Sequence, residues 1–250
     1  MNDNKDKIGD LIGLGIITAS AIGTTTALIK AKYAKGKTLP EWYYGYITGY
    51  NTVPGDLYDV YIQKDDEIYL WARLRGIWFE NECDYYKYLY DNLRWYGLPV
   101  GGSLIAIGHS LMAGVHALGR RAPMRGFNNW GVKAGWEWRR AGKPFWLGDT
   151  KEYNWELKKY VDVPGAKWRF YNSMYDAIDN FISILESYYP VAFEELFSLE
   201  PDINRYVYGL EHGLNGRRYA TGAFNMREVI AWAVERVPRE LNEHFGYVIK

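Results

Sequence analysis

The sequence lacks a second cysteine, an excess of charge and a phosphate-binding glycine-rich loop. Its single cysteine, Cys83, cannot form an internal disulfide and excludes a zinc site built from several cysteines. The 30 basic and 30 acidic residues cancel, so no net charge attracts the chain to phosphate backbones. No glycine-rich loop ends in Lys-Ser or Lys-Thr, so no nucleotide site is indicated. The sequence therefore predicts no cofactor and no nucleic-acid partner.

Aromatic residues are abundant, with 23 Tyr and 11 Trp against 9 Phe. Tyr and Trp rings can lie flat against a sugar and also form hydrogen bonds, as carbohydrate clefts require. The same residues build the core and rim of ordinary α+β domains. Composition leaves both interpretations open, whereas the length of 250 residues and the 48% apolar content favour one domain with appendages.

Residues 11–29 form a run without a charged side chain. Its length is close to the roughly 20 residues that a helix needs to cross a bilayer, and its many small residues suit close helix packing. A signal peptide and a buried helix are the alternatives. A signal peptide normally begins with basic residues, and here acidic residues outnumber Lys5 and Lys7. We expect residues 1–37 to hold a membrane anchor and a basic flank.

Turn and helix signals divide the following part of the chain. Residues 38–80 are predicted to be a connecting region of turns and strands, with a hairpin formed by residues 57–63 and 67–74. Asn81 is predicted to cap a helix that ends at Gly97. Ser103 is predicted to start a second helix, residues 104–118, which is apolar on nearly all sides and therefore buried.

The remaining part of the chain combines short strands with helices. Residues 129–171 contain short aromatic stretches broken by Gly and Pro, which indicates a small irregular β-lobe. Ser173 and Asp176 form a capping pair for another helix. Its expected apolar face carries Tyr175, Ile178, Ile182 and Leu185. Further helices are expected at residues 191–197, 203–210 and 226–237, so the fold class is α+β.

Four short motifs follow the predicted buried helix. They are Asn128-Asn129-Trp130-Gly131-Val132-Lys133, Thr150-Lys151-Glu152-Tyr153, Trp168-Arg169-Phe170-Tyr171-Asn172-Ser173 and Tyr219-Ala220-Thr221. In this order they resemble the N-L-F-G-I-K, T-x-E-Y, F-R-x-Y-x-S and Y-A-T-D motifs of glycoside hydrolase family 73. Those proteins are endo-β-N-acetylglucosaminidases that cleave peptidoglycan. The resemblance implies a lysozyme-like domain over residues 81–250 that binds peptidoglycan glycan strands, although Gly222 replaces the final Asp.

The resemblance also implies roles for individual residues. Glu152 matches the second glutamate of the family, and Tyr219 matches the tyrosine near the scissile bond. The residue types of the first motif suit a glycan: Asn128 and Asn129 offer amides, Trp130 offers a ring for a sugar face, and Lys133 can pair with an acidic substituent. The alternative interpretation is a turn held by Asn side chains, with the Trp130 ring in the core.

The general acid of the family has no counterpart in this sequence. Glycoside hydrolysis needs a protonated carboxyl group at the leaving oxygen and a second group at the anomeric carbon. Residues 92–136 contain no Asp or Glu, although the family carries its acid in an L-E-S-G-x-G motif on the buried helix. Laid without a gap on residues 111–114, this motif places the acid at Met112, whereas a slip of one residue places it at Ala113, the preferred position. Both positions share a helix face with His109 and His116.

Three explanations for the missing acid remain open. The glutamate was replaced by engineering, a natural binding domain lost catalysis, or a histidine took over the role of the acid. His109 and His116 cannot hold one metal ion together, because seven residues of helix separate them by roughly 10 Å. The sequence therefore predicts no metal site.

The function predicted from the sequence is peptidoglycan binding and cleavage of the glucosaminidase type, by a phage-encoded protein. The alternative is a non-catalytic murein-binding or structural protein of a membrane or virion. We expect a location at the membrane, in the cell envelope or in a virion. The lysines after residue 29 would face the cytoplasm under the positive-inside rule, which conflicts with an external murein target unless a virion carries the protein.

Overall fold

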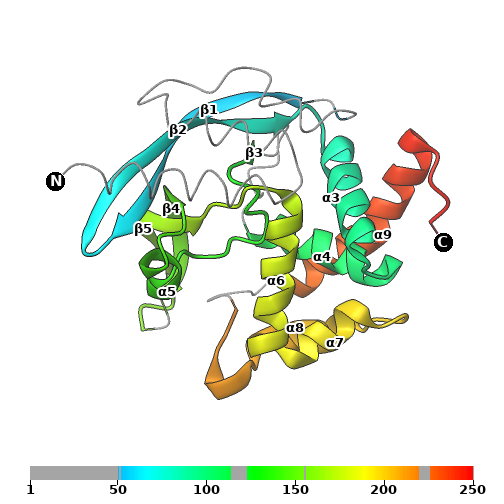
Figure 1. The fold of residues 1–250 in the computed structure, drawn as a ribbon. Helices are drawn as coiled ribbons and strands as arrows, with labels where there is room; N and C mark the ends of the chain where they lie inside the picture. The colour runs from blue at the N-terminus through cyan, green and yellow to red at the C-terminus, as the bar shows by residue number, and fades with distance from the viewer. Residues whose placement is uncertain (1–49, 51, 114–122, 155, 220–225, 250) are drawn as a thin grey trace.

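A computed structural model describes residues 50, 52–113, 123–154, 156–219 and 226–249. The strands gather on one side of the molecule and most of the helices on the other, as Figure 1 shows. Within these described ranges, no helix is both long enough and apolar enough to cross a bilayer. The expected anchor at residues 11–29 lies outside the described residues.

Within the described residues, the strands form one antiparallel sheet of five, in the order β3-β2-β1-β4-β5. Their bounds are β1 Thr52–Lys64, β2 Glu67–Phe79, β3 Pro123–Met124, β4 Phe145–Asn154 and β5 Lys159–Arg169. The predicted hairpin is present as β1 and β2, and the predicted β-lobe as β4 and β5. Val60 of β1 pairs with Trp146 of β4. The hairpin of the expected connecting region 38–80 therefore belongs to the same sheet as strands of the expected domain 81–250.

Seven α-helices lie in the described residues, which confirms the α+β class. Their bounds are α3 Glu82–Tyr96, α4 Val100–Ala113, α5 Trp136–Arg140, α6 Met174–Tyr188, α7 Pro190–Phe197, α8 Ile203–Glu211 and α9 Met226–Phe245. Two predicted caps are present. The Asn81 side chain accepts a hydrogen bond from the Asp84 amide at 2.9 Å, and the Ser173 hydroxyl accepts one from the Asp176 amide at 3.1 Å.

Three details of the helices differ from the predictions. Helix α4 begins at Val100, so Ser103 lies inside the helix and its amide bonds to the Pro99 carbonyl. Helix α9 continues past Pro238 to Phe245. Tyr175 is 48% exposed, because the buried face of α6 is rotated by about one residue position from the expected face. That face consists of Met174, Ala177, Ile178, Phe181, Ile182 and Leu185.

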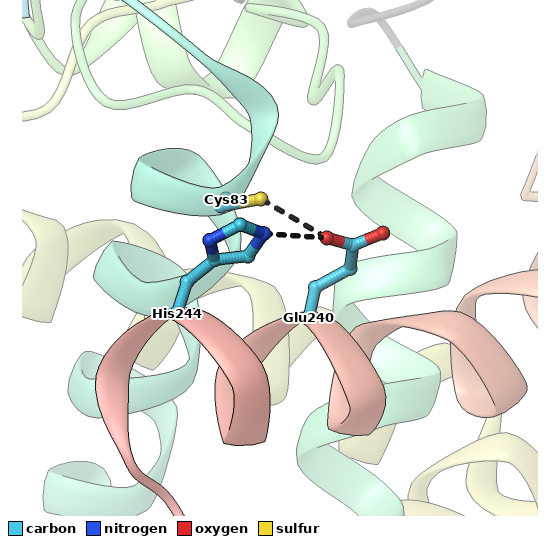
Figure 2. A group of neighbouring side chains, drawn as sticks. All are labelled: Cys83, Glu240 and His244. Atoms are coloured by element: carbon cyan, nitrogen blue, oxygen red, sulfur yellow. Dashed lines mark hydrogen bonds and ion pairs between the residues drawn. The ribbon is translucent and has the colours of Figure 1, made fainter.

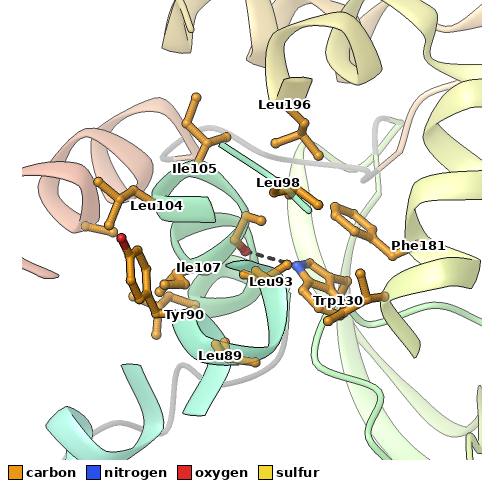
Figure 3. Packing of buried hydrophobic residues seen from close by; sticks show 14 of the residues in the cluster. Leu89, Tyr90, Leu93, Leu98, Leu104, Ile105, Ile107, Trp130, Phe181 and Leu196 are labelled. Carbon is orange, nitrogen blue, oxygen red and sulfur yellow. Dashed lines mark hydrogen bonds between the residues drawn. The ribbon is translucent and has the colours of Figure 1, made fainter. Parts of the chain in front are cut away.

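Helix α4 is the centre of the core, as predicted, with residues 102–111 all buried. Figure 3 shows side chains from other elements packed around it. Glycines allow the closest approaches: a β-carbon at Gly102 would lie 1.9 Å from the carbonyl oxygen of Leu196 in α7, and one at Gly108 would lie 2.7 Å from the Cα of Ile230 in α9. The small residues of α4 therefore let neighbouring backbones contact it directly.

Replacing Gly102 with Ala is expected to destabilise the protein by about 1–3 kcal/mol, because the added methyl group overlaps a backbone carbonyl that cannot rotate away. Urea denaturation followed by circular dichroism measures this change. Gly135→Ala is the matched control: Gly135 has a φ of −59°, and among the described residues other than its chain neighbours no atom lies within 4 Å of its added β-carbon. Equal stability of the two variants would contradict the close packing of α4 against α7.

Candidate functional site

The loop of residues 128–133 is closed by the side chain of Asn128. Its Oδ1 accepts a hydrogen bond from the Val132 amide at 2.8 Å. Its Nδ2 donates to the Val132 carbonyl at 2.8 Å and to the Arg169 carbonyl of β5 at 3.1 Å. Gly131 has a φ of 60°, in the left-handed region that favours glycine. The Asn128 amide is thus used inside the protein, as the turn interpretation expects.

Trp130 lies in the core and not on the surface. Its side chain is 1% exposed, its ring stacks on Phe181 with centroids 4.5 Å apart, and its Nε1 donates to the Ala106 carbonyl of α4 at 3.0 Å (Figure 3). Asn129 is also buried, with Nδ2 3.5 Å from the sulfur of Met174. The expectation that Trp130 and Asn129 contact a sugar is therefore corrected: both side chains attach the loop to the core.

The end of helix α4 adjoins this loop. A β-carbon at Gly131 would lie 2.6 Å from the carbonyl oxygen of Ala113 and 3.3 Å from its β-carbon. The neighbouring side chain, Met112, is half-buried and packs against the core. Of the two positions considered for the missing acid, Ala113 is thus the one found against Gly131.

The loop ends at Lys133, whose ammonium group forms an ion pair with Glu152 of β4. Lys133 also makes a backbone bridge to Trp168 of β5, and its Nζ lies 6.0 Å from the centroid of that ring. The side chains of Lys133 and Glu152 are 50% and 30% exposed, so a ligand can reach both. The structure therefore brings together two residues that the sequence placed in the site.

Tyr219 contacts the same loop. Its hydroxyl donates to the Trp130 carbonyl at 3.1 Å, and its ring centroid lies 4.6 Å from that of His109. Burial of the hydroxyl away from water raises the pKa of Tyr219 well above its usual value, so the hydroxyl keeps its proton. Tyr219 therefore acts as a hydrogen-bond donor to the loop.

The third motif holds the loop against β5. The backbone amide of Arg169 donates to the Val132 carbonyl at 3.0 Å, and Nε of the Arg169 side chain donates to the Lys133 carbonyl at 3.1 Å. The Arg169 guanidinium and the Tyr171 hydroxyl both donate to Oδ1 of Asn180 in α6, at 2.6 and 2.7 Å. Sequence reasoning gave Arg169 no role although it stands in a motif, and nothing in the sequence pointed to Asn180.

His109 is fully buried in α4 and is not suited to the role of the acid. Its Nδ1 lies 2.6 Å from the hydroxyl of Tyr206, and its ring packs against Phe181 and Tyr219. Burial lowers the pKa of His109 to about 3, so the ring is neutral at physiological pH and has no imidazolium proton to give. The proposal of a histidine acid is therefore corrected for His109, and His116 lies outside the described residues.

Burial of His109 makes stability depend on pH. The unfolded chain binds a proton near the ordinary pKa of about 6.5, but the folded chain does so only near 3, so stability falls as the pH drops between these values. From pH 7.5 to 5.0, His109 should account for a loss of about 2 kcal/mol. Urea denaturation at both pH values should show this loss reduced in His109→Gln and retained in His212→Gln, a change at an exposed position. A loss of equal size in both variants would contradict the depressed pKa.

Comparison with known proteins gives one structural likeness. No protein-family model matches the sequence, and no curated protein matches it. Among solved structures, the chain is similar in fold to a peptidoglycan hydrolase mutant from Sphingomonas sp. A1. The two share 16% sequence identity, the alignment covers 64% of this chain and 95% of that one, and the TM-score is 0.46. A likeness at this level assigns no role to any residue of this chain.

Proposed function

We propose that this chain binds peptidoglycan glycan strands at the surface around Lys133 and Glu152, in a lysozyme-like domain of the glucosaminidase type. The observation that carries the proposal is that the other three motifs and the end of α4 meet the loop formed by the first motif. Ala113 adjoins Gly131, Glu152 pairs with Lys133, and Tyr219 bonds to the Trp130 carbonyl. Arg169 of the third motif bonds to the Lys133 carbonyl. Tyr219 lies 89 residues from Trp130 in the chain.

The chemistry of the exposed groups suits a glycan with acidic substituents. Lys133 can pair with a lactyl or peptide carboxylate of murein, and it forms an ion pair with Glu152. The Glu152 carboxylate can then assist at the anomeric carbon or activate water. Trp168, half-buried beside Lys133, offers the sugar a ring in place of Trp130.

The proton donor is the missing part of this site. Cleavage requires a carboxyl group that protonates the leaving oxygen, and the side chain of Ala113 cannot do so. Because Ala113 adjoins Gly131, a longer acidic side chain there would start next to the binding loop. Without this proton donor, the chain as it stands is expected to bind glycan strands but not to cleave them. An acid at position 113 is expected to permit cleavage. A place at the cell envelope or in a virion, with residues 11–29 as anchor, belongs to the same proposal.

Restoring the acid should restore cleavage. Ala113→Glu is expected to release muropeptides from purified peptidoglycan about 10²–10⁴ times faster than the parent chain, the usual contribution of a positioned acid. Mass spectrometry of the reduced products should identify N-acetylglucosamine at the reducing end. The Met112→Glu variant, acidic at the neighbouring position, should stay at the parent rate.

Binding and folding are measured in parallel. The parent chain should co-sediment with insoluble peptidoglycan, and both variants should retain the circular dichroism spectrum of the parent. Co-sedimentation without release by folded Ala113→Glu would contradict the assigned acid position alone. Failure of the parent chain to bind would contradict the proposed function.

Glu152→Gln tests the surviving carboxylate. In the Ala113→Glu chain, this change is expected to lower the rate of muropeptide release at least about 100-fold, because the neutral amide cannot stabilise positive charge or take a proton from water. Stability should change by less than about 1 kcal/mol, since the pair with Lys133 is accessible to solvent. Asp162→Asn is the control: Asp162 lies on the adjacent strand and pairs with Lys151 at 3.7 Å. Similar release by the two variants would remove Glu152 from the mechanism.

A further inference from the structure

Three side chains with metal-binding atoms meet between helices α3 and α9, on elements that do not form the glycan site. Cys83 lies in the first turn of α3, while Glu240 and His244 lie one turn apart near the end of α9. Figure 2 shows the thiol, the carboxylate and the imidazole pointing toward one another. Their ligand atoms all lie within 4.8 Å of one another.

The distances between the ligand atoms match those between neighbouring ligands of a tetrahedral metal ion. Oε2 of Glu240 lies 3.3 Å from Sγ of Cys83 and 3.3 Å from Nε2 of His244. Ligands at normal bond lengths around a tetrahedral zinc ion are separated by about 3.5 Å for sulfur and oxygen and about 3.3 Å for nitrogen and oxygen. Two of the three distances between ligand atoms therefore have the required length before any side chain moves.

A neighbouring arginine fixes the orientation of the carboxylate. Nε of Arg236 donates to Oε1 of Glu240 at 3.0 Å, which leaves Oε2 directed at Cys83 and His244. The Arg236 charge is shared with Glu82, whose Oε2 lies 3.5 Å from the guanidinium. A hydrogen-bonded partner of this kind is a regular feature of metal sites, because it holds a ligand in one position.

The surroundings also suit a cation of charge two. A thiolate and a carboxylate together neutralise such an ion, so the half-buried site carries no excess charge. His244 is 56% exposed, which opens the site to solvent for entry of the ion and for a water molecule in the fourth position. Without an ion, burial and Glu240 raise the pKa of the Cys83 thiol to about 11, so ion binding must release the thiol proton to solvent.

We propose that Cys83, Glu240 and His244 bind one divalent transition-metal ion of the zinc class, with water as the fourth ligand. The thiolate and imidazole select zinc or cobalt over magnesium and calcium, which prefer oxygen ligands. The bound ion joins the first turn of α3 to the last turns of α9 and thereby stabilises the packing of the two helices.

Cobalt(II) is the probe, because a cobalt–thiolate bond gives a charge-transfer absorption in the near ultraviolet. Titration of the full chain, freed of metal and reduced, should saturate this band at one equivalent, and only Cys83 can supply the thiolate. Zinc should displace cobalt and raise the Tm by roughly 5 °C or more. Magnesium should do neither.

Variants separate a three-ligand site from simple binding to a thiol. His244→Ala and Glu240→Gln should each weaken cobalt binding more than about 100-fold, beyond the usual effect of losing a partner of a ligand. Cys83→Ser should abolish the band, and His212→Ala, which changes an exposed histidine outside the cluster, should leave it intact. His244 is exposed, so its variant is expected to keep the parent circular dichroism spectrum. Absence of the band in the parent chain, or a band unchanged in His244→Ala and Glu240→Gln, would overturn the proposal.

Discussion

The attachment of Trp130 to the core positions everything else around the candidate site. Its ring stacks on Phe181 of α6, and its indole nitrogen bonds to the Ala106 carbonyl of α4. The ring fills the space between two helices, so the loop that carries it cannot move away without opening a cavity, and large aromatic cavities cost several kcal/mol. Lys133, three residues further on, is thereby held beside Glu152 at the surface. Trp130 is therefore not an exposed platform for a sugar, and its burial makes the site rigid.

Electrostatics divide the residues near the loop into two groups. Lys133 and Glu152, which solvent reaches, form an ion pair with each other. Inside the helical core, a charge without a partner costs far more than a hydrogen bond returns. His109 illustrates this: burial favours its uncharged form, and Tyr206 gives it a neutral partner. Ala113, at the end of α4, adjoins the loop.

The candidate metal cluster shows how far apart in sequence the residues of one site can lie. Glu240 and His244 have the i, i+4 spacing that places two ligands on one helix face, and this signal was present in the sequence. Cys83 stands 157 residues from Glu240, and only the packing of α3 against α9 brings the thiol to 3.3 Å from the carboxylate. A search of the sequence for paired histidines or several cysteines does not find such a set.

The sequence by itself determined the α+β class, the hairpin, the caps of α3 and α6, and the burial of α4, because each depends on local periodicity or on hydrogen bonds between near neighbours. It also determined that residues 92–136 hold no carboxylate. Only the tertiary structure decided that Trp130 is buried, that Tyr175 is exposed, that β1 joins the sheet of β4 and β5, and that Lys133 meets Glu152. These outcomes depend on which surfaces of distant segments pack together, and the free energy of that packing is shared among residues that no local pattern connects.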